Sequence, residues 1–284
     1  MNRENTFCLY TPQLSTIHSY LEMVDYAADH GIRQLETLNI FELATPDLEF
    51  AKKLRSYADS KGITFSCVSV GIDLVGDNGR EAIETLKQYA PIAKVLGSPY
   101  LHHTIALNVS DPKLTEDNFD LFYSRGLAAV REVFDYAATL GIRTIYEDQG
   151  FLFNGQKNFA RFLQDVERNV GIVADFGNIQ FVDEHVEGFI SAFADRIVHV
   201  HVKDYLVTPG TSREKLPGEY TSRGGNYLAG CLIGQGSVHM EDAFQALKDI
   251  GYRGAFSLEG DPIGPDEEAS FCKNHKIVED YLWI

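Results

Sequence analysis

The sequence predicts a single (β/α)8 barrel, an α/β fold in which eight parallel strands are each followed by a helix. Short apolar runs alternate with amphipathic segments along the whole chain of 284 residues. A glycine recurs just before the next strand, as at Gly141 and Gly251, where a left-handed residue is expected to end a helix. Several of the apolar runs end in a carboxylate or an imidazole, which is the layout of a barrel active site.

Each predicted strand is a short apolar run followed by a polar or glycine-containing segment. In chain order the strands are predicted at Phe7 to Tyr10, Gln34 to Leu38, Thr64 to Val70, Tyr100 to Thr104, Thr144 to Glu147, Gly171 to Asp175, Ile197 to Val202 and Ala255 to Glu259. The segments between them place apolar residues at a spacing near 3.6, which predicts helices. The length suits one barrel of about 250 residues with additions, so we expect one domain over residues 1–284. An open doubly wound sheet is the alternative.

One connection is much longer than the others. From about residue 205 to residue 236 the chain runs through Pro209, Pro217 and repeated glycines before a helical pattern resumes at Met240. Ordinary connections in such folds are short. A long loop at the catalytic end of a barrel is therefore predicted to be a lid or a binding loop.

The composition excludes several classes of function. A formal net charge of -16 repels phosphate backbones and anionic membranes, and no basic run offsets it, so we expect no nucleic-acid or membrane partner. No apolar stretch approaches the roughly 20 residues of a membrane helix, and a cytoplasmic protein is expected. The four cysteines are widely spaced without a CxxC motif, which indicates reduced thiols and no thiolate zinc site.

Four potential metal ligands stand at the ends of the last four predicted strands. They are Glu147, Asp175, His201 and Glu259. Singly, such an acid can cap a helix and such a histidine can be a hydrogen-bonded strand residue, but parallel strands bring the four side chains together. Three carboxylates and one imidazole suit Mn²⁺, Mg²⁺ or Co²⁺, with Zn²⁺ as a further possibility. The sequence therefore predicts one divalent metal ion.

The seventh strand carries two further polar side chains on the predicted ligand face. Side chains alternate along a strand, so His199 and Lys203 share the face of His201, and spacing alone does not decide which histidine binds the ion. We choose His201 because it lies nearer the catalytic rim. Lys203 is expected either to contact a substrate oxygen or phosphate, or to pair with Asp204 at the surface.

Two adjacent histidines end the fourth strand. Only one of His102 and His103 can point into the barrel, because neighbouring side chains face opposite sides. One of the two is therefore predicted to contact the substrate, and the other is predicted to be structural.

On these residues the chain resembles the xylose-isomerase-like barrel superfamily of sugar and sugar-phosphate isomerases and epimerases. The resemblance covers essentially the whole chain and includes all four ligand positions, the segment from His201 to Asp204, and Gly234-Gln-Gly-Ser-Val. Asp175-Phe-Gly-Asn178 is similar to the corresponding segment of L-xylulose 5-phosphate 3-epimerases. Ketohexose 3-epimerases instead carry histidine at the position of Asn178 and arginine at that of Val207. The resemblance implies carbohydrate metabolism, a sugar or sugar phosphate as substrate, and a homodimer as one possible assembly.

The resemblance implies a ketose or ketose-phosphate 3-epimerase that works by proton abstraction through an enediolate. A divalent ion can stabilise the negative charge that develops beside a carbonyl. In a 3-epimerase the proton leaves one face and returns to the other, so Glu147 and Glu259 are the candidate acid and base. In an aldose-ketose isomerase one base could suffice.

Other activities share this fold and stay open. They are hydroxypyruvate isomerase and sugar-derived dehydratase within the same resemblance, and, more distantly, an AP endonuclease or a non-catalytic sugar-binding barrel. The endonucleases of this fold need more histidines on the early strands, where this chain has Ser66, Cys67 and Ser69.

The glycines of Gly234-Gln-Gly236 raise the question of a phosphate site. Backbone N–H groups of a glycine loop can approach a phosphate closely, Lys203 is one basic residue that could assist, and the resemblance through Asn178 also favours a phosphate. The other interpretation is that these glycines only turn the chain. A phosphorylated substrate held by Gly234, Gly236 and basic residues such as Arg213 or Arg223 is the resulting hypothesis.

Overall fold

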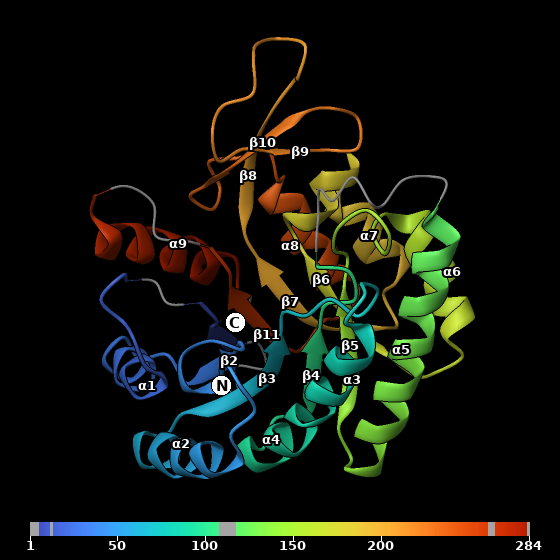
Figure 1. Cartoon of the computed structure of the whole chain (residues 1–284). Helices are drawn as coiled ribbons and strands as arrows, with labels where there is room; N and C mark the ends of the chain where they lie inside the picture. Colours follow the sequence, from blue (N-terminus) through green and yellow to red (C-terminus); the bar gives the residue numbers. More distant parts are fainter. Residues whose placement is uncertain (1–5, 12–13, 108–117, 261–264, 283–284) are drawn as a thin grey trace.

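The computed structural model describes residues 6–11, 14–107, 118–260 and 265–282. Eight strands close a barrel in the order β1-β11-β7-β6-β5-β4-β3-β2, and every neighbouring pair is parallel. Helices surround this barrel (Figure 1). The predicted (β/α)8 fold class is thus confirmed.

The eight barrel strands lie where the apolar runs predicted them, and their ends differ from the predicted ends by no more than one residue. They are β1 (Thr6–Leu9), β2 (Gln34–Thr37), β3 (Thr64–Val70), β4 (Tyr100–His103), β5 (Arg143–Glu147), β6 (Gly171–Asp175), β7 (Ile197–Val202) and β11 (Ala255–Leu258). Parallel pairing around a closed barrel brings all their carboxyl ends to one rim.

The helices begin and end at the residues that local chemistry favours. The Ser19 and Asp47 side chains accept hydrogen bonds from backbone N–H groups in the first turns of α1 and α2. Gly62 and Gly97 end α2 and α4 with φ values of 71° and 74°, as the recurring glycines predicted. The helices are α1 (Tyr20–Asp29), α2 (Leu48–Lys61), α3 (Gly79–Lys87), α4 (Tyr89–Leu96), α5 (Phe119–Thr139), α6 (Gln156–Val166), α7 (Val186–Ala192), α8 (Met240–Asp249) and α9 (Glu267–Tyr281), with 3-10 turns η1 (Phe41–Leu43) and η3 (Asn178–Val182). Within the described ranges, no helix combines the length and the apolarity needed to cross a membrane.

The barrel interior changes from apolar to polar along the strands. Cys67, Ile145 and Val173 form a small apolar cluster that is separate from the main core between strands and helices. Glu147 and Asp175 follow Ile145 and Val173 by two residues, so they lie on the same inward face but nearer the carboxyl rim. The strands therefore place polar side chains over an apolar base.

The segment predicted as a long loop contains a small antiparallel sheet. Its strands are β8 (Asp204–Thr208), β9 (Tyr220–Thr221) and β10 (Tyr227–Cys231), in the order β8-β10-β9. This correction to the loop at about 205–236 is visible in Figure 1, where the sheet stands above the barrel. Only one residue separates the end of β7 from the start of β8, so the sheet rises directly from the barrel rim.

The return of the chain from this sheet to α8 is organised by one carboxylate. Asp204 accepts hydrogen bonds from the backbone N–H groups of Gly234 at 3.0 Å, Gly236 at 2.8 Å and Val238 at 3.1 Å. A Cβ atom on Gly236 would lie 2.2 Å from Asp204 Oδ1, so only glycine allows this approach. The glycine loop therefore wraps an anion that the chain supplies itself.

We expect Asp204→Ala to lower the free energy of unfolding by about 3 kcal/mol, because three backbone N–H groups lose their acceptor. Urea denaturation measures this difference. Asp204→Asn is the matched variant, because it keeps one acceptor oxygen, and its loss should be smaller. A change within about 0.5 kcal/mol for Asp204→Ala, the range of an ordinary surface substitution, would show that Asp204 does not hold this loop.

Candidate metal centre

The carboxyl rim brings the four predicted ligands into one group. Glu147 and Asp175 are the last residues of β5 and β6, His201 lies one residue before the end of β7, and Glu259 directly follows β11. The Glu259 N–H donates to the Val202 carbonyl at 3.1 Å, which fixes the backbone just beyond the strand. One ligand atom from each of the four residues lies within 4.8 Å of the others.

His201 Nδ1 is the common neighbour of the three carboxylates. It lies 3.3 Å from Glu147 Oε2, 3.1 Å from Glu259 Oε2 and 3.8 Å from Asp175 Oδ2. Lys203 Nζ lies 3.0 Å from Asp175 Oδ2 and 2.9 Å from Glu259 Oε1. Lys203 is therefore neither a surface residue paired with Asp204 nor a free cation, since it contacts two of the predicted ligands.

Burial and mutual repulsion set the protonation of this group. Burial raises the pKa of Asp175 to about 7; the Lys203 ammonium opposes this shift, and the carboxylates of Glu259 and Glu147 add to it. Burial alone would lower the pKa of Lys203, but Asp175 and Glu259 raise it well above its ordinary value. The ammonium therefore stays charged and offsets part of the negative charge of the site.

The donor atoms present fit a hard divalent cation. Asp175 Oδ2 and Glu259 Oε2 have cationic side chains nearby but no hydrogen bond, and both are buried atoms. Unsatisfied buried oxygens of this kind call for a cation or a ligand. Three carboxylates and an imidazole nitrogen supply the oxygen-rich set that such ions prefer.

Asn178 orients one ligand from outside the group. Its backbone N–H and that of Gly177 each donate to Asp175 Oδ1 at 2.8 Å, which leaves Oδ2 directed at Lys203 and His201. The Asn178 carbonyl accepts from Asn154 Nδ2 at 2.7 Å. The side-chain Nδ2 of Asn178 is buried without a hydrogen-bond partner in the described structure, so this donor is available to a ligand.

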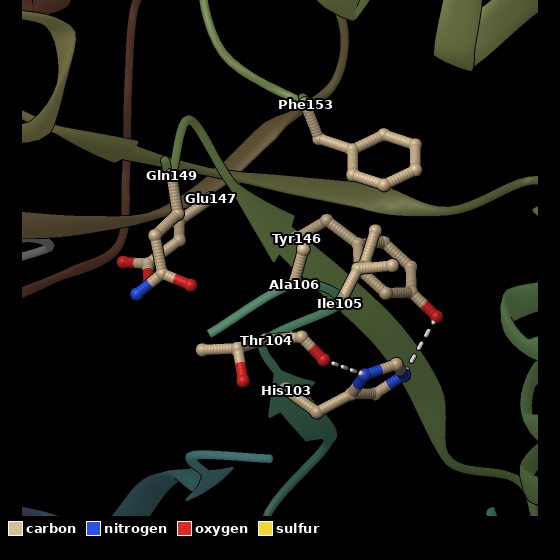
Figure 2. Close-up of a pocket in the computed structure, with 8 residues that line it drawn as sticks. All are labelled: His103, Thr104, Ile105, Ala106, Tyr146, Glu147, Gln149 and Phe153. Atoms are coloured by element: carbon tan, nitrogen blue, oxygen red, sulfur yellow. Dashed lines mark hydrogen bonds between the residues drawn. The ribbon is translucent and has the colours of Figure 1, made fainter. Parts of the chain in front are cut away.

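The two histidines at the end of β4 face opposite ways. His102 Nε2 lies 3.8 Å from Glu147 Oε1, inside the site. His103 Nε2 lies 2.9 Å from the Tyr146 hydroxyl, and Figure 2 shows both rings on the side of β5 that Glu147 does not face. Burial lowers the pKa of His103 to about 3, so the ring is neutral. Its small cavity of about 10 Å³ is too small for a sugar, and we assign His103 a structural role.

Glu36 on β2 is a site residue that the sequence analysis missed. It contacts both His199 and His201 through their Nε2 atoms, at 2.6 Å and at 3.1 Å. Burial alone would raise its pKa, but the two histidines hold it well below its ordinary value. The available signal was the alternation in Gln34-Leu-Glu-Thr, which puts Glu36 on the inward face of a buried strand.

Asp148 is a second residue that was missed. Its Oδ1 accepts from the Asp175 N–H at 2.9 Å, while its Oδ2 is buried without a hydrogen-bond partner among the described residues. Burial, followed by the charge of Asp175, raises its pKa well above the ordinary value. Asp148 therefore holds the backbone of Asp175 through this hydrogen bond, and its raised pKa favours the neutral carboxyl group, which adds no charge to the site.

A cavity of about 370 Å³ opens next to the candidate metal centre and beneath the small sheet. Its lining includes Lys203, Glu259, Tyr205, Tyr220 and Asn274. This volume lies within the range of small-molecule sites. Gly234 and Gly236, predicted to contact a substrate, direct their backbone N–H groups at Asp204.

The comparison with protein families agrees with this architecture. The model of the xylose isomerase-like TIM barrel family matches residues 24–275. The chain belongs to this family. The resemblance inferred from the sequence is thereby confirmed at the level of the family, which contains more than one chemistry.

Solved structures share the fold along almost the whole chain. A xylose isomerase domain protein from Planctomyces limnophilus has a TM-score of 0.78 at 19% identity, covering 99% of this chain and 98% of that one. A xylose isomerase-like barrel protein from Mycobacterium smegmatis in complex with magnesium has 0.69 at 18%, covering 93% and 88%. D-psicose 3-epimerase with D-tagatose from Clostridium cellulolyticum H10 has 0.69 at 20%, covering 94% and 89%.

Curated relatives match a smaller part of the chain. An inosose dehydratase from Geobacillus thermodenitrificans is 24% identical over 154 residues, which is 53% of this chain. The chain spans about half the length of the curated relatives that it matches, with 44% and 49% of their residues covered. Such a partial match supports kinship but does not carry over an activity.

We expect the affinity of the site for Co²⁺ to rise with pH between pH 6 and pH 8. Asp175, with a pKa of about 7, holds a proton at low pH; burial lowers the pKa of His201, but Glu36, Glu147 and Glu259 raise it well above its ordinary value. The ion binds only after these protons leave, so affinity should increase about tenfold or more per pH unit.

Isothermal titration calorimetry at several pH values measures this dependence. The exposed His18, replaced by alanine, is the control and should leave the pH profile unchanged. A flat affinity across this range would contradict the prediction, because it would mean that ion binding displaces no proton from Asp175 or His201 between pH 6 and pH 8.

Proposed function

We propose that this protein is a divalent-metal-dependent ketose 3-epimerase. The observation that carries the proposal is the meeting of Glu147 and Glu259 at one histidine nitrogen, beside Asp175 and a cavity of sugar size. The structural similarity to a D-psicose 3-epimerase supports the same choice. Mn²⁺, Mg²⁺ and Co²⁺ are the proposed ions, and the magnesium complex of a similar barrel is consistent with them.

The two glutamates are suited to exchange a proton across a substrate. They come from β5 and β11, which are separated in the barrel by β6 and β7, so their carboxylates approach from different sides. A bound divalent ion would polarise the ketose carbonyl and stabilise the negative charge that develops there. One glutamate then removes the C3 proton, and the other delivers a proton to the opposite face.

Lys203 and His102 complete the polar surroundings of the substrate. The Lys203 ammonium lies 2.9 Å from Glu259 Oε1, so it stabilises the carboxylate form of that base. His102 Nε2 is buried without a hydrogen-bond partner among the described residues and lies 3.8 Å from Glu147 Oε1. These two groups, with the free amide of Asn178, are the proposed contacts of the sugar hydroxyls.

We propose a free ketose rather than a ketose phosphate as substrate. The N–H groups of Gly234 and Gly236 are used by Asp204, and Arg213 pairs with Glu219 at 2.5 Å. Lys203 is the only cationic side chain among the described residues that line the cavity, and it is already balanced by two carboxylates. A phosphate dianion would meet mainly negative charge there.

A sugar-derived dehydratase is the second candidate. The observation in its favour is the sequence match to an inosose dehydratase over 154 residues. Loss of water and inversion at one carbon can both begin by removal of a proton next to a carbonyl, so the same glutamates would serve either reaction. Mass analysis separates the two, because a dehydrated product is lighter than its substrate and an epimer is not.

We expect Glu147→Gln and Glu259→Gln each to lower kcat for ketose epimerisation by at least about a hundredfold, because glutamine cannot act as a base. Glutamine keeps one ligand oxygen, so part of the metal affinity should remain. Glu49→Gln, an exposed substitution of the same kind on α2, is the control and should keep full activity. The wild-type enzyme in D₂O should place deuterium at C3 of the product.

Complete conversion without deuterium at any carbon would contradict a reaction in which two glutamates exchange protons with solvent. Deuterium at C1 or C2 would instead identify an aldose-ketose isomerase.

We expect kcat/KM for a free ketopentose to exceed that for its 5-phosphate by about tenfold or more, since about 1.4 kcal/mol of repulsion is enough for this factor. Arg213→Gln should leave the ratio unchanged, because the Arg213 guanidinium is engaged by Glu219. Equal or better turnover of the phosphate would restore the hypothesis of a phosphate site.

A further inference from the structure

The Glu36 carboxylate, fully buried in the barrel, is surrounded by four groups that can donate hydrogen bonds. His199 Nε2 lies 2.6 Å from Oε2, and Ser257 Oγ lies 2.5 Å from the same oxygen. His201 Nε2 lies 3.1 Å from Oε1 and 3.2 Å from Oε2, and the Ser69 hydroxyl donates to Oε1. A carboxylate of this kind accepts from all four neighbours and donates to none.

This arrangement determines which nitrogen of His201 carries a proton. Because the ionised Glu36 can only accept, His201 Nε2 must be the donor and therefore carries a hydrogen. The other ring nitrogen, Nδ1, is the one that faces the carboxylates of Glu147, Asp175 and Glu259. A neutral His201 therefore presents the lone pair of Nδ1 to the predicted ions, with Glu36 behind it.

The same carboxylate also acts on His102 through Ser69. Ser69 has one hydroxyl hydrogen, and it is given to Glu36 Oε1. At the 3.0 Å contact between Ser69 Oγ and His102 Nδ1, the serine oxygen is left as the acceptor, so His102 Nδ1 carries the proton. A neutral His102 then presents a bare Nε2 toward Glu147, and this nitrogen is buried without a partner among the described residues.

We propose that Glu36 is a positioning residue that fixes the tautomers of two site histidines, with Nδ1 of His201 unprotonated for the metal ion and Nε2 of His102 unprotonated for a substrate hydroxyl. The inference about His201 rests on the proposed metal centre. The inference about His102 rests on hydrogen bonding alone. Glu36 would thus influence both the metal ion and the substrate through the two histidines, without contacting the ion or the substrate itself.

The proposal gives His102 a defined polarity toward the sugar. An unprotonated Nε2 accepts a hydrogen bond from a hydroxyl and cannot donate one. It repels the lone pairs of a carbonyl or phosphate oxygen placed at the same point. The relay from Glu36 through Ser69 therefore selects a ligand that offers a hydroxyl hydrogen beside Glu147.

Nitrogen NMR of the ¹⁵N-histidine-labelled protein loaded with ¹¹³Cd²⁺ tests both tautomers without any turnover. For His201 we expect coupling between cadmium and Nδ1, with the ring proton on Nε2. For His102 we expect the proton on Nδ1. His201→Gln and His102→Gln assign the two sets of signals by their disappearance.

Glu36→Gln and Ser69→Ala separate the two branches. We expect Glu36→Gln to weaken Co²⁺ binding by about 10- to 100-fold, the usual effect of removing the partner of a ligand histidine. Ser69→Ala should leave Co²⁺ affinity within about twofold, yet allow the His102 proton to move to Nε2. Glu49→Gln on the surface controls for the change of charge and should alter neither readout.

Cadmium coupling to His201 Nε2, or a His102 proton on Nε2 in the unaltered protein, would overturn the proposal. So would Glu36→Gln that folds and binds Co²⁺ with unchanged affinity. These results differ from failure of the proposed function. A protein that shows the expected tautomers but turns over no ketose keeps this inference and loses the epimerase. If no ion binds, the proposal is judged by the His102 tautomer, because the hydrogen bonds from Glu36 through Ser69 to His102 do not involve the ion.

Discussion

The need to balance buried negative charge governs this end of the barrel. Four acidic side chains point into one small volume at low exposure, and they are Glu36, Glu147, Asp175 and Glu259. An unpaired buried charge is strongly destabilising. His201 meets this need by standing between Glu36 and the other three, and Lys203 by bridging Asp175 and Glu259. The negative charge that is left is consistent with the proposed divalent cation.

The parts of the structure that local pattern encodes could be predicted from the sequence. The barrel strands are short apolar runs between helical segments, and the convergence of the four predicted ligands follows because parallel strands share one rim. Alternation along β2 could place Glu36 on the inward face, but it could not predict the contacts of Glu36 with His199 and His201, which lie 163 and 165 residues further along the chain. Its importance becomes visible only when the barrel closes and β2 faces β7 across the interior.

The small sheet and the glycine loop show a different limit of sequence analysis. Prolines and glycines between Tyr205 and Gly236 predict irregular structure, yet β8 and β10 pair over five residues each. The glycine N–H groups were expected to bind a substrate anion, and they bind the carboxylate of Asp204. A backbone nest has the same sequence whether its anion is a ligand or a side chain of the chain itself, so only the fold distinguishes the two.

The short link between β7 and β8 has a consequence for the evolution and engineering of specificity. Lys203 is the single residue between β7 and β8. The small sheet that covers the cavity is therefore joined to the strand of His201 through the residue whose ammonium contacts Asp175. Exchange of the small sheet for one of another shape would tilt this junction and displace the ammonium from Asp175 and Glu259. The small sheet therefore cannot be replaced without affecting the site. A foreign loop is best joined to the chain after Asp204, where the hydrogen bonds from Gly234 and Gly236 already hold the backbone.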